Sequence, residues 1–382
     1  MSYDIVVIGA GSVGTPAAFY LAREGLKVLV IDHLPSPGQG SNKAAIGGVR
    51  ATHSDPAKIR LGLRTIEILT SFKDEFGCDV EWRPGGYVFV AYRPEEEKTL
   101  RELVALQRSF GLDIRWCDAE ELLKVVPDLN PKGLRGGTYS PGDGHCSPLL
   151  LNHAYYELAK KTGAEFHFGE EVQGVEVRGS RVQKVYTNKG AYPAASLLNA
   201  AGAWAARIGK FLGLNHPVYP DCHEAGITEP VEHFLDPMIV DIRPGPGSAN
   251  CYFHQLATGQ IAFCITPEPP ILGEDRRETS VFLPQVAKRI IQVVPRLAGI
   301  RVRRTWRGLY PMTPDGLPLV GALEEIRGYF VAIGLCGQGV MLGPALGELI
   351  ARLITGKTEP GDRVVLEKLS PSRSFQTQEV LR

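Results

Sequence analysis

The feature that most constrains the fold is a glycine-rich turn near the N-terminus, with the sequence GAGSVG at residues 9–14. The apolar run at 4–8 precedes this turn, and a helix-like stretch follows it to about Glu24, before a second apolar run at 27–31. Short continuous apolar runs are typical of buried parallel strands. The N-terminal region is therefore expected to form a strand–helix–strand (βαβ) unit.

Each glycine of this turn has a physical role in such a unit. Gly9 permits the tight turn, Gly11 lets a pyrophosphate approach the backbone, and Gly14 lets the helix pack closely on the strand. The helix N-terminus then faces the phosphates. Asp32 ends the second strand, where its carboxylate can accept hydrogen bonds from a ribose diol. The pattern predicts dinucleotide binding, against the alternative of a merely tight turn, and it does not separate FAD from NAD.

Composition narrows the class of protein further. Lys and Arg total 42 and Asp and Glu total 42, so the chain lacks the basic field that nucleic-acid binding requires. The seven cysteines are scattered without a CxxC pair, so a disulfide framework, an iron–sulfur cluster and a metal site are not expected. The N-terminus lacks a signal-peptide pattern, and the apolar run at 4–8 is too short to span a membrane. We expect a cytoplasmic protein without a transmembrane segment, and leave peripheral membrane association open.

The remaining patterns predict two interleaved domains rather than two in series. Residues 33–48 form a loop, and a strand at 87–92 opens a region of different texture. Other expected helices are 56–72, 94–110, 118–125, 147–162 and a last one ending near 354; other expected strands are 171–177, 181–187, 196–199 and 329–333. The fold class is α/β, α+β overall, with a Rossmann-type cofactor domain (1–80, 145–212 and 305–382) interleaved with a β-sheet-based substrate domain (81–144 and 213–304).

Four segments beyond the glycine turn carry a resemblance to a known family. They are residues 40–50, residues 172–187 with the following 199–204, residues 313–318 (TPDGLP), and residues 334–339 (GLCGQG) leading into 347–348. In this combination the chain resembles the D-amino-acid-oxidase-type family of FAD-dependent amine oxidoreductases, over nearly its whole length. Within that family it is most similar to the β subunits of dye-linked L-proline dehydrogenases and multimeric sarcosine oxidases.

The resemblance implies FAD as the cofactor, and the loop 334–339 agrees with it. This loop follows an expected buried strand and precedes a helix, so its N–H groups and the helix N-terminus can face one edge of a flavin. Reduced flavin carries negative charge near N1 and C2=O, which such a helix end stabilises. The alternative is a plain strand–helix turn. The expected FAD contacts are Gly9, Gly11, Ser12, Val13, Gly14, Asp32, His33, Ser41, Asn42, Gly47, Gly48, Val172, Ala201, Gly202, Trp204, Gly308, Gly334, Gly337, Gln338, Gly339, Val340 and Met341.

The resemblance also assigns substrate-binding residues. Arg50 falls where the family binds the substrate carboxylate, which its planar fork can hold bidentately. Tyr252 falls at an active-site tyrosine, and Gln255 lies on the same cavity-lining segment. The alternatives are a surface salt-bridge arginine and a core tyrosine. His254 should point away on a regular strand, and His53, His145 and His223 are given no role.

Three positions depart from the family. Gly308 stands where monomeric sarcosine oxidases attach FAD through a cysteine, so FAD is expected to bind without a covalent link. Phe263 aligns with a lysine above the flavin that assists oxygen reduction, which a phenylalanine cannot do. Met341 aligns with a second carboxylate-binding lysine, which leaves Arg50 as the main anchor.

The resulting hypothesis is an FAD-dependent dehydrogenase for a small amino acid or N-alkyl amino acid. Hydride passes from Cα to flavin N5, and water hydrolyses the imine; no strong base is needed if the amine binds neutral. Electrons leave through a second electron-transfer subunit or a quinone-like acceptor, and we expect an oligomer. Two alternatives stay open: oxidation of a 2-hydroxy acid or glycerol phosphate, which needs a base, and a non-catalytic flavin subunit of an electron-transfer complex.

Overall fold

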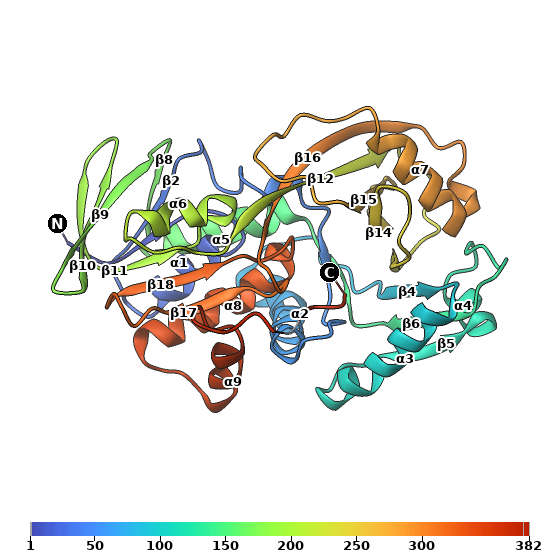
Figure 1. Ribbon diagram of the computed structural model, residues 1–382, viewed down its shortest axis with the longest axis horizontal. Helices are drawn as coiled ribbons and strands as arrows, with labels where there is room; N and C mark the ends of the chain where they lie inside the picture. Colours follow the sequence, from blue (N-terminus) through green and yellow to red (C-terminus); the bar gives the residue numbers. More distant parts are fainter. Residues whose placement is uncertain (1, 377, 382) are drawn as a thin grey trace.

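The structure is a computed structural model that describes residues 2–376 and 378–381. Within this range the strands form two large sheets and a small third one, as the ribbon in Figure 1 shows. The first large sheet lies in the half of the molecule that contains the N-terminus, and the second lies in the other half. The mixed α/β architecture agrees with the fold class expected from the sequence.

The first sheet is built on the N-terminal βαβ unit. Its strand order is β17-β18-β11-β1-β2-β8, with the hairpin β9–β10 attached through β11. Strands β1 and β2 are parallel, as are β1 and β11, which places the carboxyl ends of these strands at one edge. The bounds are β1 Tyr3–Ile8, β2 Val28–Asp32, β8 Glu165–Phe168, β9 Val172–Arg178, β10 Arg181–Thr187, β11 Ala191–Asn199, β17 Leu319–Ala322 and β18 Tyr329–Ile333.

Helices cover the first sheet and form its core with it. Helix α1 packs between α5 and α8, and its crossing with α8 is close, because a Cβ on Gly343 would lie 1.9 Å from the Ser12 carbonyl oxygen. Asp55 caps α2 by accepting a hydrogen bond from the Ala57 N–H. The bounds are α1 Gly14–Arg23, α2 Pro56–Phe76, α5 Pro148–Lys161, α6 Ala205–Lys210, α8 Gly339–Thr355 and α9 Pro360–Lys368.

The second sheet has the order β16-β12-β15-β14-β13-β4-β6-β5, and helices α3, α4 and α7 pack on it. Its neighbouring strands are antiparallel except for β4 and β13. The bounds are β4 Tyr87–Ala91, β5 Arg115–Asp118, β6 Gly136–Ser140, β12 Tyr219–Thr228, β13 Met238–Asp241, β14 Ser248–Gln255, β15 Ile261–Pro267, β16 Val302–Met312, α3 Pro94–Ser109, α4 Ala119–Val125 and α7 Phe282–Val293.

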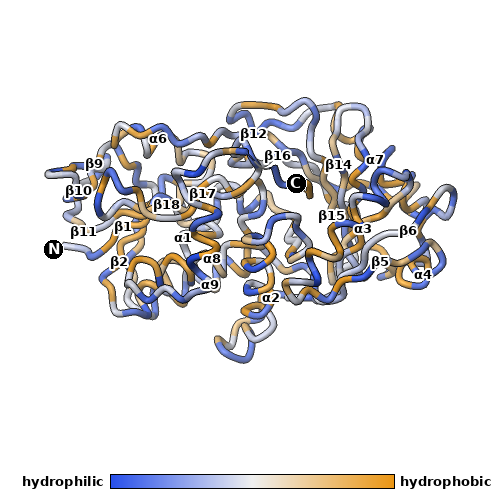
Figure 2. The backbone as a smooth tube through the Cα atoms, turned by 60° about the horizontal axis from the view of Figure 1, so that its bottom comes forward, coloured by the Kyte–Doolittle hydropathy of each residue, from blue (hydrophilic) through white to orange (hydrophobic). Residues whose placement is uncertain are grey.

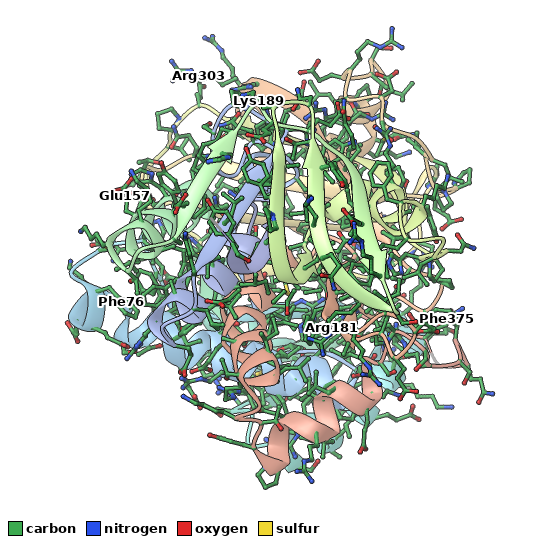
Figure 3. The ribbon with its side chains drawn as sticks, turned by 90° about the vertical axis from the view of Figure 1, so that its left-hand side faces the viewer. Phe76, Glu157, Arg181, Lys189, Arg303 and Phe375 are labelled. Atoms are coloured by element: carbon green, nitrogen blue, oxygen red, sulfur yellow. The ribbon has the colours of Figure 1, made fainter. Side chains whose placement is uncertain are left out.

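The expected helices and strands occur, with ends that differ by a few residues. The hairpin turn lies at Gly179 and Ser180, whose φ angles are 54° and 57°. Figure 3 shows this hairpin with Arg181 at the start of β10 and Lys189 in the loop after its other end. The elements that were not expected include helices α6, α7 and α9 and the eleven-residue strand β16. Strand β16 pairs with β12 of the second sheet, so it crosses the predicted domain boundary at 304/305. The division into domains stays a prediction.

Hydrophobic residues concentrate in the inner elements, as the colouring of β1, β2 and α8 in Figure 2 shows. The first sheet is buried on both faces, against helices that include α1, α5 and α8 on one side, and against the β9–β10 hairpin and α6 on the other. Across the described ranges, no single helix is long and apolar enough to cross a membrane; the bent pair α8 and α9 passes that test by length and composition alone.

Candidate active site

One large cavity lies between the two sheets and is lined by residues of both. Helices α1 and α8 both begin at its wall, because Val13 and Gln338, which precede them, line it. Neither helix start has a side-chain cap, so N–H groups of the first turns are available to a ligand. Two positive helix ends therefore converge on one cavity, which suits an anionic cofactor.

The geometry of the N-terminal glycine turn leaves room for a pyrophosphate. A Cβ on Gly9, whose φ is 106°, would lie 2.5 Å from the Ala200 carbonyl oxygen, and one on Gly14 would lie 1.8 Å from the Gly9 carbonyl oxygen. A Cβ on Gly11 would meet nothing within 4 Å. Gly9 and Gly14 thus let strand and helix pack, while Gly11 leaves open space beside the backbone where a pyrophosphate can approach.

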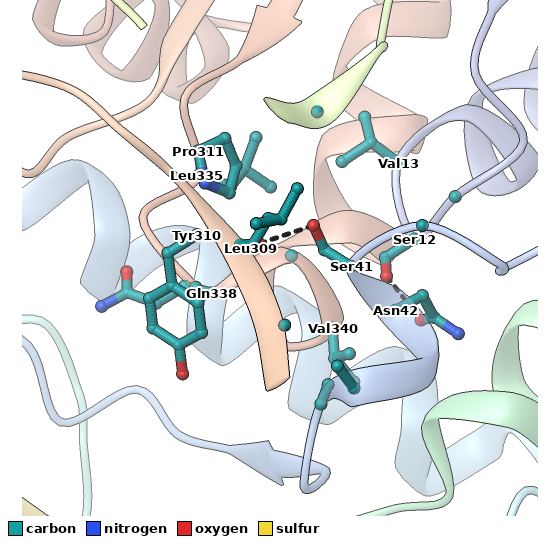
Figure 4. A pocket seen from close by; sticks show the side chains of 18 of the residues that line it. Ser12, Val13, Ser41, Asn42, Leu309, Tyr310, Pro311, Leu335, Gln338 and Val340 are labelled. Carbon is teal, nitrogen blue, oxygen red and sulfur yellow. Dashed lines mark hydrogen bonds between the residues drawn. The ribbon is translucent and has the colours of Figure 1, made fainter. Parts of the chain in front are cut away.

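Polar side chains fix the loops around this turn. The Asp32 carboxylate accepts from the Ala10 N–H at 2.8 Å and from the Leu34 N–H at 2.9 Å, and it lines the cavity. Ser41 Oγ donates to the Leu309 carbonyl at 2.6 Å, and Ser12 Oγ donates to Asn42 Oδ1 at 2.6 Å; Figure 4 draws both bonds. These contacts tie the loop 40–44 to strand β16 of the second sheet and to the glycine turn before helix α1.

The second glycine loop, 334–339, lies beside Tyr310. A Cβ on Gly337, whose φ is 83°, would lie 2.0 Å from the Tyr310 ring. The Gln338 Oε1 atom is buried, and no described residue gives it a hydrogen bond. An open backbone at Gly11, two uncapped helix starts and this orphaned oxygen together fit a dinucleotide cofactor with a polar ring system.

The structure gathers most of the predicted cofactor residues around this cavity. Of the expected FAD contacts only Gly14 and Gly334 do not line it. Both act in packing instead, since a Cβ on Gly334 would lie 2.4 Å from the Thr313 methyl group. Gly47 and Gly48 line the cavity, but their missing Cβ atoms face protein: Cys146 and Tyr87 would be met at 2.2 and 1.9 Å.

Arg50 lies at the wall of the cavity and is nearly buried. Its Nη1 donates to the Thr52 carbonyl and to His53 Nδ1, and its Nη2 donates to the Leu381 carbonyl at 2.6 Å. The guanidinium also lies 5.3 Å from the centre of the Phe89 ring. Burial lowers the pKa of Arg50. The guanidinium of Arg50 therefore does not depend on an anion alone, because the Thr52 and Leu381 carbonyls accept hydrogen bonds from it.

Tyr252 lines the cavity and is paired with Tyr310 through their hydroxyl groups at 2.6 Å. Burial raises the pKa of both tyrosines, so both hydroxyls stay protonated at neutral pH. The His223 ring stacks on Tyr310, with centroids 3.7 Å apart, and its Nε2 lies 3.0 Å from Asp221 Oδ2. These groups form a compact polar cluster on the wall that the second sheet contributes.

Several cavity residues were missed from the sequence: Tyr87, His223, Cys264 and Tyr310. The pairing of strands could have revealed residues on this wall. Tyr252 lies opposite Val240 on one neighbouring strand and opposite Cys264 on the other, and Cys264 in turn lies opposite Ala225. Cross-strand partners share one face of a sheet. Once Tyr252 is placed on the cavity face, its partners follow, but the pairing of strands distant in sequence could not be derived from the chain alone.

Gln255 does not line the cavity, which contradicts its assignment to the active site. Its Oε1 accepts from the N–H groups of Phe234 and Leu235, and its Nε2 donates to the Glu232 and Gly259 carbonyls. Side chains alternate between the two faces of a strand, and Gln255 follows Tyr252 by three residues on β14, so the two side chains face opposite sides of the sheet. His254 also lies outside the cavity lining and donates from Nε2 to the Ile46 carbonyl at 2.7 Å.

The expectations made from the sequence for Phe263 and Gly308 both change when their surroundings in the structure are considered. Phe263 is fully buried against Phe282 in the core of the second sheet, whereas its neighbour Cys264 lines the cavity. The aligned position thus does not stand over a flavin. At Gly308, a Cβ would lie 2.5 Å from the Ala44 Cβ, so a larger residue fits only if the loop shifts. Cys264 and Cys336 do line the cavity, and burial raises the pKa of both thiols, to about 12 for Cys264.

The fold and the site are those of a dinucleotide-binding protein. The family model for FAD dependent oxidoreductases (DAO) matches residues 4–353, and the chain belongs to this family. The L-proline dehydrogenase from P. horikoshii is similar in structure, with a TM-score of 0.90 and 32% identity over 97% of both chains. Glycine oxidase from Geobacillus kaustophilus is 28% identical over 93% of both chains, and hydrogen cyanide synthase subunit HcnC from Pseudomonas aeruginosa is 28% identical over 94% of both.

FAD is therefore the cofactor, and the protein is an FAD-dependent enzyme of the amino-acid oxidase and dehydrogenase type. When bound, FAD supplies the hydride acceptor. The residues that would hold it are the two glycine turns, Asp32 and the loop 40–48. Arg50 and the Tyr252–Tyr310 pair also lie on the wall of this cavity.

Proposed function

We propose that this flavoenzyme oxidises the C–N bond of a small amino acid or N-alkyl amino acid of the proline, sarcosine or glycine type. The observation that carries the proposal is the joint placement of Arg50 and the Tyr252–Tyr310 pair on the wall of the FAD cavity. The names of its relatives, an L-proline dehydrogenase and a glycine oxidase, support the same substrate class.

Arg50 binds the substrate carboxylate in this proposal. A guanidinium has five N–H donors in a planar fork, and the described residues accept from Nη1 twice and from Nη2 once. One hydrogen on Nε and one on Nη2 then remain for a carboxylate, which two parallel bonds can hold. Cα–H is thereby oriented toward the flavin, and the protonated tyrosine pair acts as hydrogen-bond donor rather than as a base.

We further propose that electrons pass to an acceptor other than oxygen, through a second subunit or a quinone-like carrier. Among the described residues that line the cavity there is no lysine, so an ammonium group that would stabilise developing superoxide is missing there. A relative that is named as a subunit, HcnC, is in line with a partner for this chain. Turnover should be fast with an artificial dye and slow with oxygen at the same substrate concentration.

Oxidation of a 2-hydroxy acid is the second candidate, because the cavity contains a histidine that could serve as a base. His223 lines the cavity and is paired with Asp221. Burial lowers its pKa. However, Nε2 is engaged by Asp221 and Nδ1 is enclosed by protein, so neither ring nitrogen has open access to a substrate hydroxyl. This enclosure favours the amino-acid substrate.

The deciding experiment is anaerobic reduction of the bound flavin. The holoprotein is mixed without oxygen with L-proline, D-proline, sarcosine, glycine, lactate or glycerol 3-phosphate, and the flavin absorbance is followed. We expect bleaching by at least one amino acid and none by the hydroxy compounds. Bleaching by lactate or glycerol 3-phosphate alone contradicts the proposal, and bleaching by none of the six compounds favours a non-catalytic flavin subunit.

A further inference from the structure

A fully buried ion pair lies next to the substrate wall and has no part in the proposed reaction. Lys58 Nζ, in the first turn of α2, lies 3.2 Å from Glu379 Oε2, in the C-terminal segment, and neither side chain is exposed. Removing two charges from water is costly, and a buried pair need not stabilise a fold more than apolar side chains do. Its placement therefore invites a functional explanation.

Glu379 fixes the C-terminal segment to the loop before α2. Its Oε1 accepts from the Ser54 N–H at 2.9 Å, from Ser54 Oγ at 2.7 Å and from the Leu381 N–H at 3.1 Å. The Val380 N–H in turn donates to Ser54 Oγ at 2.8 Å. The segment ends near the middle of the molecule, between the two halves (Figure 1). One carboxylate thus organises both the loop and the segment.

The segment held in this way reaches the substrate wall at Leu381. The Leu381 carbonyl accepts the hydrogen bond from Arg50 Nη2. Its side chain is buried in a cluster with Tyr87, Met238 and Val240, and these three residues line the cavity. The carbonyl of Leu381 therefore holds the guanidinium, and its side chain packs behind residues that line the cavity.

We propose that Glu379 is a positioning residue for substrate carboxylate binding, acting through the segment 379–381 and the Leu381 carbonyl on Arg50. The inference deepens the proposed function and rests on it. Without the Leu381 carbonyl, the guanidinium is held only at its Nη1 end, by Thr52 and His53. Its outer nitrogens can then rotate away from the carboxylate, so binding weakens while the residues around the flavin stay in place.

The test uses two double variants that differ only in the tether. Lys58→Met with Glu379→Gln removes both charges and keeps an amide oxygen that can accept from Ser54 and Leu381. Lys58→Met with Glu379→Ala removes both charges and that oxygen. Both variants remove Lys58 and Glu379 as a pair, so neither of these two charges is left buried without the other, which would itself destabilise the protein. Thermal unfolding and bound FAD are measured for both, to confirm that each is a folded holoprotein.

The probes are L-proline and L-prolinamide, which lacks the carboxylate, and binding is followed by the change in flavin absorbance. We expect the alanine variant to bind L-proline about tenfold more weakly than the glutamine variant, the effect of one charge-assisted hydrogen bond. L-prolinamide should bind equally to both, whereas general loss of structure would weaken both probes. With substrate turnover, the difference should appear in KM and not in kcat.

Arg50→Ala, measured in the same series, separates the two proposals. If Arg50→Ala weakens L-proline binding and the two double variants bind it equally, the positioning role of Glu379 is overturned and the proposed function stands. If Arg50→Ala leaves L-proline binding unchanged, Arg50 is not the carboxylate anchor, and both proposals fall. Equal weakening of L-proline and L-prolinamide in the alanine variant also overturns the positioning role.

Discussion

The two large sheets line one cavity by different means. The first sheet contributes mainly backbone, through the turn at Gly9–Gly14 and the starts of α1 and α8. Gly9 and Gly14 are required there because a Cβ would collide with neighbouring main chain. The second sheet contributes side chains, among them Tyr252, Cys264 and Tyr310, that share one face through strand register. A substitution in the first region should therefore affect FAD binding, and one in the second should affect the substrate.

Gly14→Ala should have the largest effect, because a Cβ there would lie 1.8 Å from the Gly9 carbonyl oxygen. The turn must move, at a cost of about 1–3 kcal/mol or more, and we expect loss of bound FAD together with a lower Tm of the apoprotein. Gly11→Ala is the matched control, since its Cβ meets nothing within 4 Å. It should weaken FAD binding without lowering the Tm of the apoprotein. Normal FAD content in Gly14→Ala contradicts this account.

Arg50→Ala tests the other side of the cavity. The other arginine that lines the cavity, Arg207, is paired with Glu274. Loss of the charge-assisted contact of Arg50 should therefore lower kcat/KM, by a factor equivalent to about 2–4 kcal/mol, with every amino acid that reduces the flavin. Bound FAD should stay normal, which distinguishes this variant from Gly14→Ala. Arg50→Lys should recover only part of the activity, because an ammonium lacks the planar fork. An unchanged kcat/KM in Arg50→Ala means that the carboxylate is held elsewhere.

The same difference between the sheets explains what could be predicted from the sequence. The turn at 9–14 and the loop 334–339 are contiguous motifs that local patterns reveal. The FAD contacts expected in them line the cavity apart from Gly14 and Gly334, and their contact with FAD stays a prediction. Strand β1 and helix α1 followed from apolar runs and periodicity. Local patterns of this kind need no knowledge of distant parts of the chain.

The second sheet could not be derived in this way. Which face of a strand meets the cavity depends on register, and a one-residue error moves a side chain to the opposite side. This is the error at Gln255, and also at Phe263, where the neighbouring Cys264 faces the cavity. The contact of Arg50 with Leu381 joins residues 331 positions apart, and no local pattern announces it.

Gln255→Ala tests whether two residues of strand β14 differ in role, because Tyr252 lines the cavity and Gln255 does not. Five backbone groups at residues 231–235 and 259 would lose a hydrogen bond, so we expect a loss of about 2–3 kcal/mol in the free energy of unfolding. The KM and kcat of the folded enzyme should stay near those of the wild type, because the side chain lies outside the cavity. A KM change without a stability change would restore Gln255 to the substrate site.

Tyr252→Phe should have a smaller effect, on the reaction rather than on stability. It removes one hydroxyl of the pair with Tyr310, and we expect a loss of about 1 kcal/mol in kcat/KM. Burial raises the pKa of both tyrosines, so the neutral hydroxyls persist as pH rises and the wild-type rate should show no tyrosine ionisation below pH 10. An inflection between pH 8 and 10 that Tyr252→Phe abolishes contradicts this assignment.

The last prediction is that FAD has no covalent bond to the protein, so removing a cysteine should not change how the flavin is held. Gly308 cannot form a thioether, and the two cysteines that line the cavity, Cys264 and Cys336, are poor nucleophiles because burial raises the pKa of their thiols. Cys336 Sγ is further engaged with the Gly334 carbonyl at 3.2 Å and with Thr313 Oγ1 at 3.3 Å. Acid precipitation of the wild type should release all the yellow colour, and Cys264→Ala and Cys336→Ala should behave identically. Colour retained in the wild-type pellet and lost in one variant would identify that cysteine as a covalent link, and the flavin would then be fixed by a side chain and not by the backbone of the glycine turns alone.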